Sequence, residues 1–273
     1  MNITVIIPIH EYNEQVKTYL DKAIESILKQ ENIINEDGSL NLPNLVIVYA
    51  PEIEEQVKSH TYFNLKITYL KNEGKTDYQS QVNLAVKSVT TEYFSVLEFD
   101  DEYSTTYFKN GSKYVESFPN IDIFLTMMIE VNEKNEGIKL TNETVWAQQF
   151  VGENGEMGYL NQNALKQYTD FKISGAIIKK SEFENLGGYK SNIKLSFMYE
   201  FLLRALNNAC KVFSIPKIGY KHLATRENSL FDNYLKTMSA NERKFWFDTA
   251  TTEANILTDR NIDMSRLHKQ IVN

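Results

Sequence analysis

The chain has 273 residues, 42% of them hydrophobic and 24% charged, so it can bury the core of one large α/β domain. Its formal net charge of −7 argues against a surface that neutralises nucleic-acid phosphates or anionic lipid. The single cysteine, Cys210, excludes an intramolecular disulfide and a thiolate zinc site, which predicts a reducing, cytoplasmic compartment. No segment reaches the roughly 18 apolar residues of a membrane span, so we expect a soluble protein.

The first hundred residues alternate between apolar runs and helical patterns. Buried strands are predicted at three places, residues 3–8, 45–50 and 65–70. We expect Pro8 to end the hydrogen-bond ladder of the first strand, because proline has no N–H to donate. Helices are predicted between the strands by apolar residues at helical spacing, over residues 15–30, 51–60 and 78–89. This order predicts a mostly parallel sheet flanked by helices, with right-handed crossovers.

A fourth apolar run, residues 93–99, ends abruptly in acid. Its carboxyl end carries four carboxylates within five residues, Glu98, Asp100, Asp101 and Glu102. Open α/β sheets bind ligands at this end of their strands. Carboxylates held this close repel one another unless positive charge is added, and their oxygens suit Mg²⁺ or Mn²⁺. The alternative is a polar turn in which Asp101 or Ser104 caps the next helix.

The second half of the chain is less regular. Predicted strands cover residues 121–129, 138–140, 145–147 and 173–178. Predicted helices cover residues 105–118, 180–186 and 195–208. Residues 211–215 and 218–222 are expected to form a pair of strands separated at Pro216. From Leu230 onward, apolar residues at helical spacing predict a helical tail that packs back on the domain.

Five segments then occur in a recognisable order. They are the opening strand with His10, the helix over residues 20–30, Lys71 to Gly74 with residues 81–85, the Glu98 to Asp101 cluster, and residues 175–189 ending in Gly187-Gly188-Tyr189. Together they resemble the inverting GT-A glycosyltransferases of the large family that includes cellulose, chitin and hyaluronan synthases. The cluster resembles that family's Asp-x-Asp metal motif, with Glu98 in place of the first aspartate.

The resemblance covers roughly residues 3–229 and implies a GT-A fold, that of nucleotide-diphospho-sugar transferases. It implies a domain over residues 1–229, with a nucleotide-binding half at 1–103 and an acceptor half at 104–229, followed by a helical extension at 230–273. The implied reaction is a hexosyltransferase-type glycosyl transfer with inversion, from a nucleotide-sugar donor to an acceptor hydroxyl. A UDP-sugar is the default donor, Mn²⁺ or Mg²⁺ the metal, and the acceptor could be a glycan, a lipid-linked sugar, a protein or a modified base.

The resemblance also implies roles for single residues. Asp101 is the first choice of metal ligand, Glu98 and His222 can complete the metal site, and Asp100 binds the metal, its waters or the ribose. Arg226 or Lys221 would contact the diphosphate. The nucleotide pocket would be lined by Pro8, His10, Glu11, Glu52, Asp77 and Asn83. Three of these assignments have simpler alternatives: a polar turn for His10, an exposed helix face for Asn83, and a solvated strand end for His222.

The catalytic base is where the chain departs most from the family. The family carries a Glu-Asp pair at the start of the helix after its Gly-Gly segment, and this chain has Phe197-Met198 there. Glu200 is the only acid between Glu184 and Glu227. An isolated carboxylate in an apolar helix has a raised pKa suited to proton transfer, so Glu200 is the candidate base. The alternative is an ion pair with Arg204, four residues further on.

A second departure falls at residues 48–52, where the family usually has an Asp-Asp-Gly-Ser type ending. Only Glu52 can substitute for those acids.

Other enzyme classes fit less well. A sugar nucleotidyltransferase would carry a glycine-rich loop with Arg or Lys after the first strand, and residues 9–13 contain neither glycine nor a basic Arg or Lys. A nicotinamide dehydrogenase would carry a Gly-x-Gly-x-x-Gly turn, which is missing. The remaining alternative is a catalytically inactive relative that acts as a binding or scaffold protein.

Overall fold

The computed structural model describes residues 2–31, 41–60, 62, 65–143, 158–224, 226–227, 229–265 and 267. Its strands are β1 (Ile3–Ile9), β2 (Asn44–Tyr49), β3 (Ile67–Lys71), β4 (Tyr93–Val96), β5 (Glu102–Tyr103), β6 (Ile123–Val131), β7 (Gly137–Thr141), β8 (Tyr159–Leu160), β9 (Ile177–Lys179) and β10 (Val212–Leu223). Its helices are α1 (Glu14–Leu28), η1 (Pro51–Ile53), α2 (Glu54–Ser59), α3 (Tyr78–Ser88), α4 (Tyr107–Ser117), α6 (Gln162–Gln167), α7 (Lys180–Asn185), α8 (Phe197–Asn207), α9 (Leu230–Thr237) and α10 (Ala240–Glu253).

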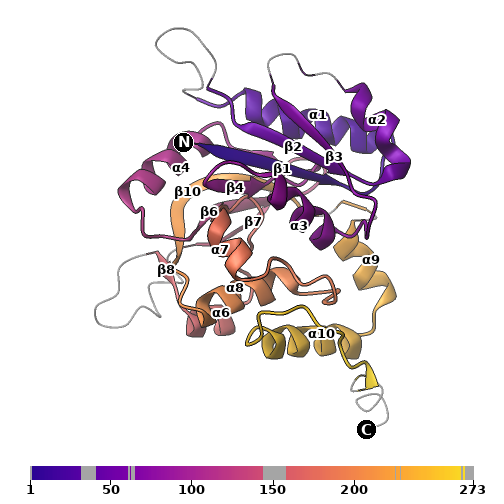
Figure 1. The fold of residues 1–273 in the computed structure, drawn as a ribbon, viewed down its shortest axis with the longest axis vertical. Coiled ribbons are helices and arrows are strands. Elements are labelled where there is room, and N and C mark those ends of the chain that lie inside the picture. Colours follow the sequence, from indigo (N-terminus) through magenta and orange to yellow (C-terminus); the bar gives the residue numbers. More distant parts are fainter. Residues whose placement is uncertain are drawn as a thin grey trace.

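The strands form one sheet with helices on both faces (Figure 1). Alternate residues of β1 point to opposite faces, as strand geometry requires. Val5 and Ile7 pack in the core that α1, α2 and α4 cover, whereas Ile6 packs in the core that α3, α6, α7, α8 and α10 cover. None of the helices in the described part of the chain has the length and apolar character needed to cross a membrane.

The strand order is β3-β2-β1-β4-β9-β6-β10-β5. The first four strands are parallel, as their alternation with helices predicts. β9 is antiparallel to both β4 and β6, and β10 is parallel to β6. The carboxyl ends of β1, β4 and β10 therefore lie at the same edge of the sheet, and this edge is where the acidic cluster is found.

Two predictions about proline were wrong. β1 continues through Pro8 to Ile9, and Pro8 is in register with Val48 of β2. The carbonyl of Ile6 accepts a hydrogen bond from the N–H of Leu97, the residue after β4. Residues two apart in a strand direct their backbone groups to the same side, so the nitrogen of Pro8 also faces this side, at a point beyond the end of β4. The missing N–H of Pro8 therefore leaves no partner unpaired.

Pro216 does not separate two strands either. β10 is one strand, and its register against β6 shifts between Ile215 and Ile218 and again before Tyr220. Irregularities of this kind tolerate proline inside a sheet. β9 begins only at Ile177, later than predicted, because Gly175 turns the chain with φ 69° against the ring of Tyr220. The strand predicted at residues 145–147 lies outside the described residues.

Helix α10 packs against α8, in the second half of the domain (Figure 1). The ring of Phe247 in α10 stacks on Tyr199 of α8, with centroids 4.9 Å apart. Lys190 is buried, and its Nζ donates to the carbonyls of Glu253 and Ile256 at 2.6 Å each. The same Nζ lies 3.2 Å from Oε1 of Glu200. One buried ammonium thus joins the segment after Gly187-Gly188 both to α8 and to the end of α10.

We expect Lys190→Ala to lower the free energy of unfolding by about 3 kcal/mol, because it leaves buried carbonyls and part of the Glu200 carboxylate without a donor. Urea unfolding monitored by circular dichroism measures the change. The matched control is Lys194→Ala, since Lys194 is exposed on the same segment. Equal stability of the two variants would contradict the role of Lys190.

Candidate active site

Asp101 lies at the centre of the acidic cluster and is 1% exposed. Its carboxylate is paired with His222, whose Nδ1 lies 3.0 and 3.1 Å from the two oxygens. The backbone N–H of Leu223 donates to Oδ1 at 2.9 Å. The pairing follows from the sheet, because the end of β10 runs antiparallel to β5, which begins at the residue after Asp101. Residues 121 positions apart in sequence are thereby held in contact.

Arg226 connects this edge of the sheet to β1. Its Nε donates to Asp100 at 2.6 Å, and its Nη1 lies 3.3 Å from Oε1 of Glu11. The guanidinium also lies over the ring of Phe99, 5.0 Å from the centroid. The ring of His10 approaches the same phenylalanine, with centroids 5.9 Å apart. Arg226 is thus the cation around which the ends of β1 and β4 meet.

Glu98 faces the start of α8. One carboxylate oxygen accepts a hydrogen bond from Ser174 Oγ at 2.6 Å, and the Glu98 backbone N–H donates to the Tyr220 hydroxyl at 3.1 Å. Ser174 Oγ also contacts Sδ of Met198 at 3.9 Å. Ser174 therefore connects Glu98 to Met198, the second residue of α8.

The electrostatics of the cluster show uncompensated negative charge. Burial, together with the neighbouring Asp101 carboxylate, raises the pKa of Glu98 to about 7 and that of Asp100 to about 6. Burial alone would lower the pKa of His222, but the charge and hydrogen bond of Asp101 raise it to about 9. His222 is therefore a cation at neutral pH, and the cluster still favours additional positive charge.

A divalent cation fits the chemistry of these donors, since two carboxylates and an imidazole supply the oxygen and nitrogen ligands that Mn²⁺ accepts. Their arrangement is that of an ion pair: His222 lies against Asp101. Among the residues that the structure describes, no three His, Cys, Asp or Glu side chains are grouped as metal ligands are. A metal ion bound by both Asp101 and His222 thus requires His222 to exchange its contact with Asp101 for one with the ion.

Two of the predicted nucleotide-pocket residues hold the fold together. Asp77 is the N-cap of α3 and accepts hydrogen bonds from Ser80 N at 2.8 Å and Ser80 Oγ at 2.9 Å. Asn83 is half-buried, donates to the carbonyl of Tyr189 at 2.7 Å and accepts from its N–H at 2.8 Å. Gly188, with φ 70°, permits this contact, because a Cβ there would lie 2.6 Å from Oδ1 of Asn83. Asn83 is therefore not on an exposed helix face, and its amide holds the backbone of Tyr189.

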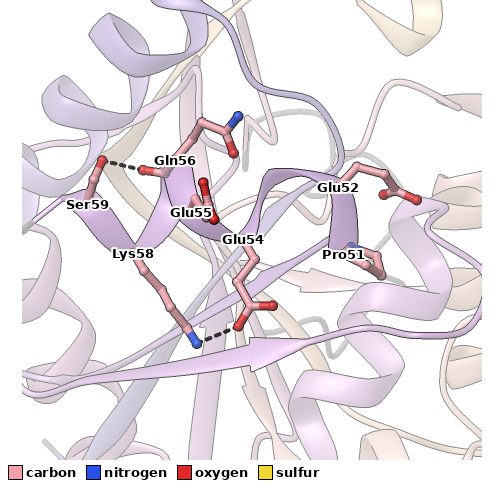
Figure 2. Close-up of a pocket in the computed structure, with 7 residues that line it drawn as sticks. All are labelled: Pro51, Glu52, Glu54, Glu55, Gln56, Lys58 and Ser59. Carbon is pink, nitrogen blue, oxygen red and sulfur yellow. Dashed lines mark hydrogen bonds and ion pairs between the residues drawn. The ribbon is translucent and has the colours of Figure 1, made fainter.

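Glu52 is exposed and lies in the turn that follows β2. It lines a hollow of about 770 Å³ along η1 and α2, together with Pro51, Glu54, Glu55, Gln56, Lys58 and Ser59 (Figure 2). Glu54 in this hollow is paired with Lys58 at 2.6 Å and with Lys71 at 3.4 Å. No other predicted site residue lines the hollow, although β2, which leads into η1, ends beside β1, where the N–H of Ala50 donates to the carbonyl of Ile9 at 3.2 Å.

Glu200 has the geometry of the ion-pair alternative. It is fully buried, and Arg204 donates from Nε to Oε1 at 2.8 Å and from Nη2 to Oε2 at 3.0 Å. Lys190 is a second cation beside Oε1. Arg204 also donates to the carbonyls of Leu186 and Gly188. With both oxygens occupied and no exposed surface, Glu200 stabilises the Gly187-Gly188 segment and is not placed to take a proton from an acceptor.

Sequence reasoning missed several residues that complete the site. Phe99, which lies under Arg226, is inside the acidic motif and could have been noticed as the aromatic residue between two acids. Ser174 and Tyr220 gave no signal, because they come from segments more than seventy residues further along the chain. Only the sheet topology brings them to Glu98.

The fold is that of a GT-A glycosyltransferase. Residues 4–184, more than half of the chain, match the family model described as glycosyl transferase family 2, and the chain belongs to this family. It is similar to an uncharacterized glycosyltransferase of Methanocaldococcus jannaschii, with 22% identity over 227 residues, which are 82% of this chain and 70% of that protein.

Solved structures show the same fold. TarS residues 1–349 of S. aureus, in complex with UDP-GlcNAc, aligns with a TM-score of 0.68 and 15% identity, over 98% of this chain and 69% of that one. The mannosyltransferase PcManGT of Pyrobaculum calidifontis, in complex with GDP-Man and Mn²⁺, aligns with a TM-score of 0.56 and 13% identity, over 94% of this chain and 69% of that one.

Replacing Glu200 by Gln separates the two interpretations of this residue. In a structural ion pair, the change leaves Arg204 and Lys190 as buried cations without a counter-charge, and we expect a loss of about 3 kcal/mol in the free energy of unfolding. Glu184→Gln is the control, because Glu184 forms only a surface pair with Lys180 at 3.6 Å. A Glu200→Gln protein of unchanged stability that binds donor but transfers nothing would instead identify Glu200 as the base.

Proposed function

We propose that this glycosyltransferase moves a sugar from a nucleotide-diphosphate donor to an acceptor hydroxyl in a metal-dependent reaction that inverts the anomeric centre. The observation that carries the proposal is the convergence of three acids, Glu98, Asp100 and Asp101, with two cations, His222 and Arg226, at the joint carboxyl ends of β1, β4 and β10. This edge is where α/β sheets bind nucleotides. The acceptor class stays open among glycans, lipid-linked sugars, proteins and modified bases.

The chemistry of the leaving group explains the charges. Departure of a nucleoside diphosphate develops negative charge on its oxygens, and a divalent ion when bound would neutralise part of that charge. Asp101, Glu98 and His222 are the proposed ligands. Arg226, which is buried and paired with Asp100 and Glu11, is the proposed phosphate contact, because a guanidinium forms charge-assisted hydrogen bonds with phosphate oxygens.

The donor pocket is proposed on the β1 side of this cluster. Glu11 and His10 follow β1 directly, and both lie beside Arg226 and Phe99. We propose a UDP-sugar as the default donor, which the UDP-GlcNAc complex of TarS supports. A GDP-sugar is the second candidate, because PcManGT was solved in complex with GDP-Man. The proposed setting is the reducing cytoplasm that one buried free thiol at Cys210 predicts.

Calorimetric titration with UDP, with and without Mn²⁺, tests the site directly. We expect Mn²⁺ to tighten UDP binding by about tenfold or more, which corresponds to about 1.4 kcal/mol. Asp101→Ala should abolish this gain, while Glu184→Ala, at an exposed position of α7 paired with Lys180, should preserve it. If neither UDP nor GDP binds the wild-type protein under any metal condition, the proposal fails.

The stereochemistry can be measured without knowing the acceptor, because water can replace it. A panel of UDP-GlcNAc, UDP-glucose and GDP-mannose is incubated with the protein and Mn²⁺, and the released sugar is followed by proton NMR before it mutarotates. Direct displacement predicts that the first anomer formed is opposite to that of the donor. Release of the donor's own anomer would rule out inversion, and binding without any release would support the alternative of a catalytically inactive binding protein.

A further inference from the structure

The start of α3 presents a buried hydroxyl that the fold does not use. Among the described residues, the buried side-chain atoms without a hydrogen-bond partner are Tyr78 Oη, Gln81 Oε1, Thr126 Oγ1, Thr141 Oγ1 and Trp246 Nε1. A buried polar atom without a partner is costly and is rare in folded proteins, so each one calls for a physical reason. The Tyr78 hydroxyl is the one that the acidic cluster influences: burial raises the pKa of Tyr78, and the charges of Glu98 and Asp101 raise it further.

The ring of Tyr78 packs against two other aromatic rings. Tyr78 is the first residue of α3, directly after the N-cap Asp77, so its backbone position is set by the cap. Its ring packs on Phe197, the first residue of α8, with centroids 5.5 Å apart, and on Tyr189 at 6.3 Å. These contacts hold the hydroxyl in one place without satisfying it.

A series of contacts leads from Tyr78 to Glu98. Phe197, which packs on Tyr78, is followed by Met198, and Met198 contacts the Ser174 hydroxyl that binds Glu98. Burial, and next the negative charge of Glu98, raise the pKa of Tyr78 well above its usual range. A tyrosine hydroxyl keeps its proton at neutral pH and can donate a hydrogen bond, and a carboxylate such as Glu98 can accept one.

We propose that Tyr78 is a sugar-binding residue, whose hydroxyl donates a hydrogen bond to a hydroxyl of the donor sugar while that sugar hydroxyl donates to Glu98. A sugar hydroxyl can accept and donate at once, so it satisfies both groups. A phosphate oxygen only accepts, and Glu98 would repel it. Glu98 belongs to the cluster proposed to bind the donor diphosphate, which favours the donor sugar over the acceptor as the source. The inference rests on the proposed function and adds a residue that recognises the sugar of the donor.

Tyr78→Phe tests this role, because it removes only the hydroxyl. Calorimetry compares UDP-GlcNAc, UDP-glucose and GDP-mannose with UDP and GDP, which have no sugar. We expect the variant to lose about three- to tenfold in affinity for the nucleotide sugar that the wild-type protein binds best, the range for one hydrogen bond, with unchanged affinity for the matched nucleoside diphosphate. An unchanged affinity for both ligands overturns the inference and leaves the proposed function standing. Failure of the wild-type protein to bind any of the five ligands removes the proposed function itself.

The stability of the free variant provides the second readout. Removing a buried hydroxyl that has no partner should leave Tm unchanged or raise it, whereas removing a bonded hydroxyl lowers it. The control is Tyr114→Phe on α4, where the ring stacks on Phe118 and Phe213, outside the site. A Tm of Tyr78→Phe that falls by about 3 °C or more would show that the hydroxyl has a partner within the fold, and would overturn the inference.

Discussion

The structure depends on charge compensation between two segments that are far apart in sequence. The end of β4 carries acids that cannot be held together by themselves, and the end of β10 supplies His222 for Asp101 and Arg226 for Asp100. These contacts exist only when β9 and β6 have been placed between β4 and β10. The acidic cluster therefore has its two cationic partners only when the sheet is complete.

A second set of charges supports the opposite side of the site. Arg204 and Glu200 hold the carbonyls around Gly188, Asn83 holds the backbone of Tyr189, and Lys190 connects this segment to the end of α10. The start of α8 is apolar, with Phe197 and Met198 as its first residues. The buried Glu200 thus stabilises the Gly187-Gly188 segment through Arg204, and Phe197 packs on the ring of Tyr78.

The sequence was a good guide where local patterns decide the structure. Strands β1 to β4 and the helices between them follow from apolar runs, helical spacing and turn signals, and the family resemblance, now confirmed, placed the acidic cluster at a ligand-binding edge. Local patterns could not show that Pro8 faces a side with no neighbouring strand, or that β10 passes through Pro216. Nor could they show that Glu200 would be enclosed by Arg204 and Lys190, since Lys190 comes from a separate segment. The roles of Asp101, Glu98 and His222 toward a metal stay predictions.

The most direct measurement is anomalous diffraction from a crystal grown with Mn²⁺ and UDP. If the acidic end of β4 is the metal and diphosphate site, the manganese peak lies within bonding distance of Asp101, and the diphosphate density lies between that peak and Arg226. A manganese peak elsewhere, for example beside Glu52 and Glu55 in the hollow along α2, with no nucleotide at the ends of β1 and β4, would contradict the assignment.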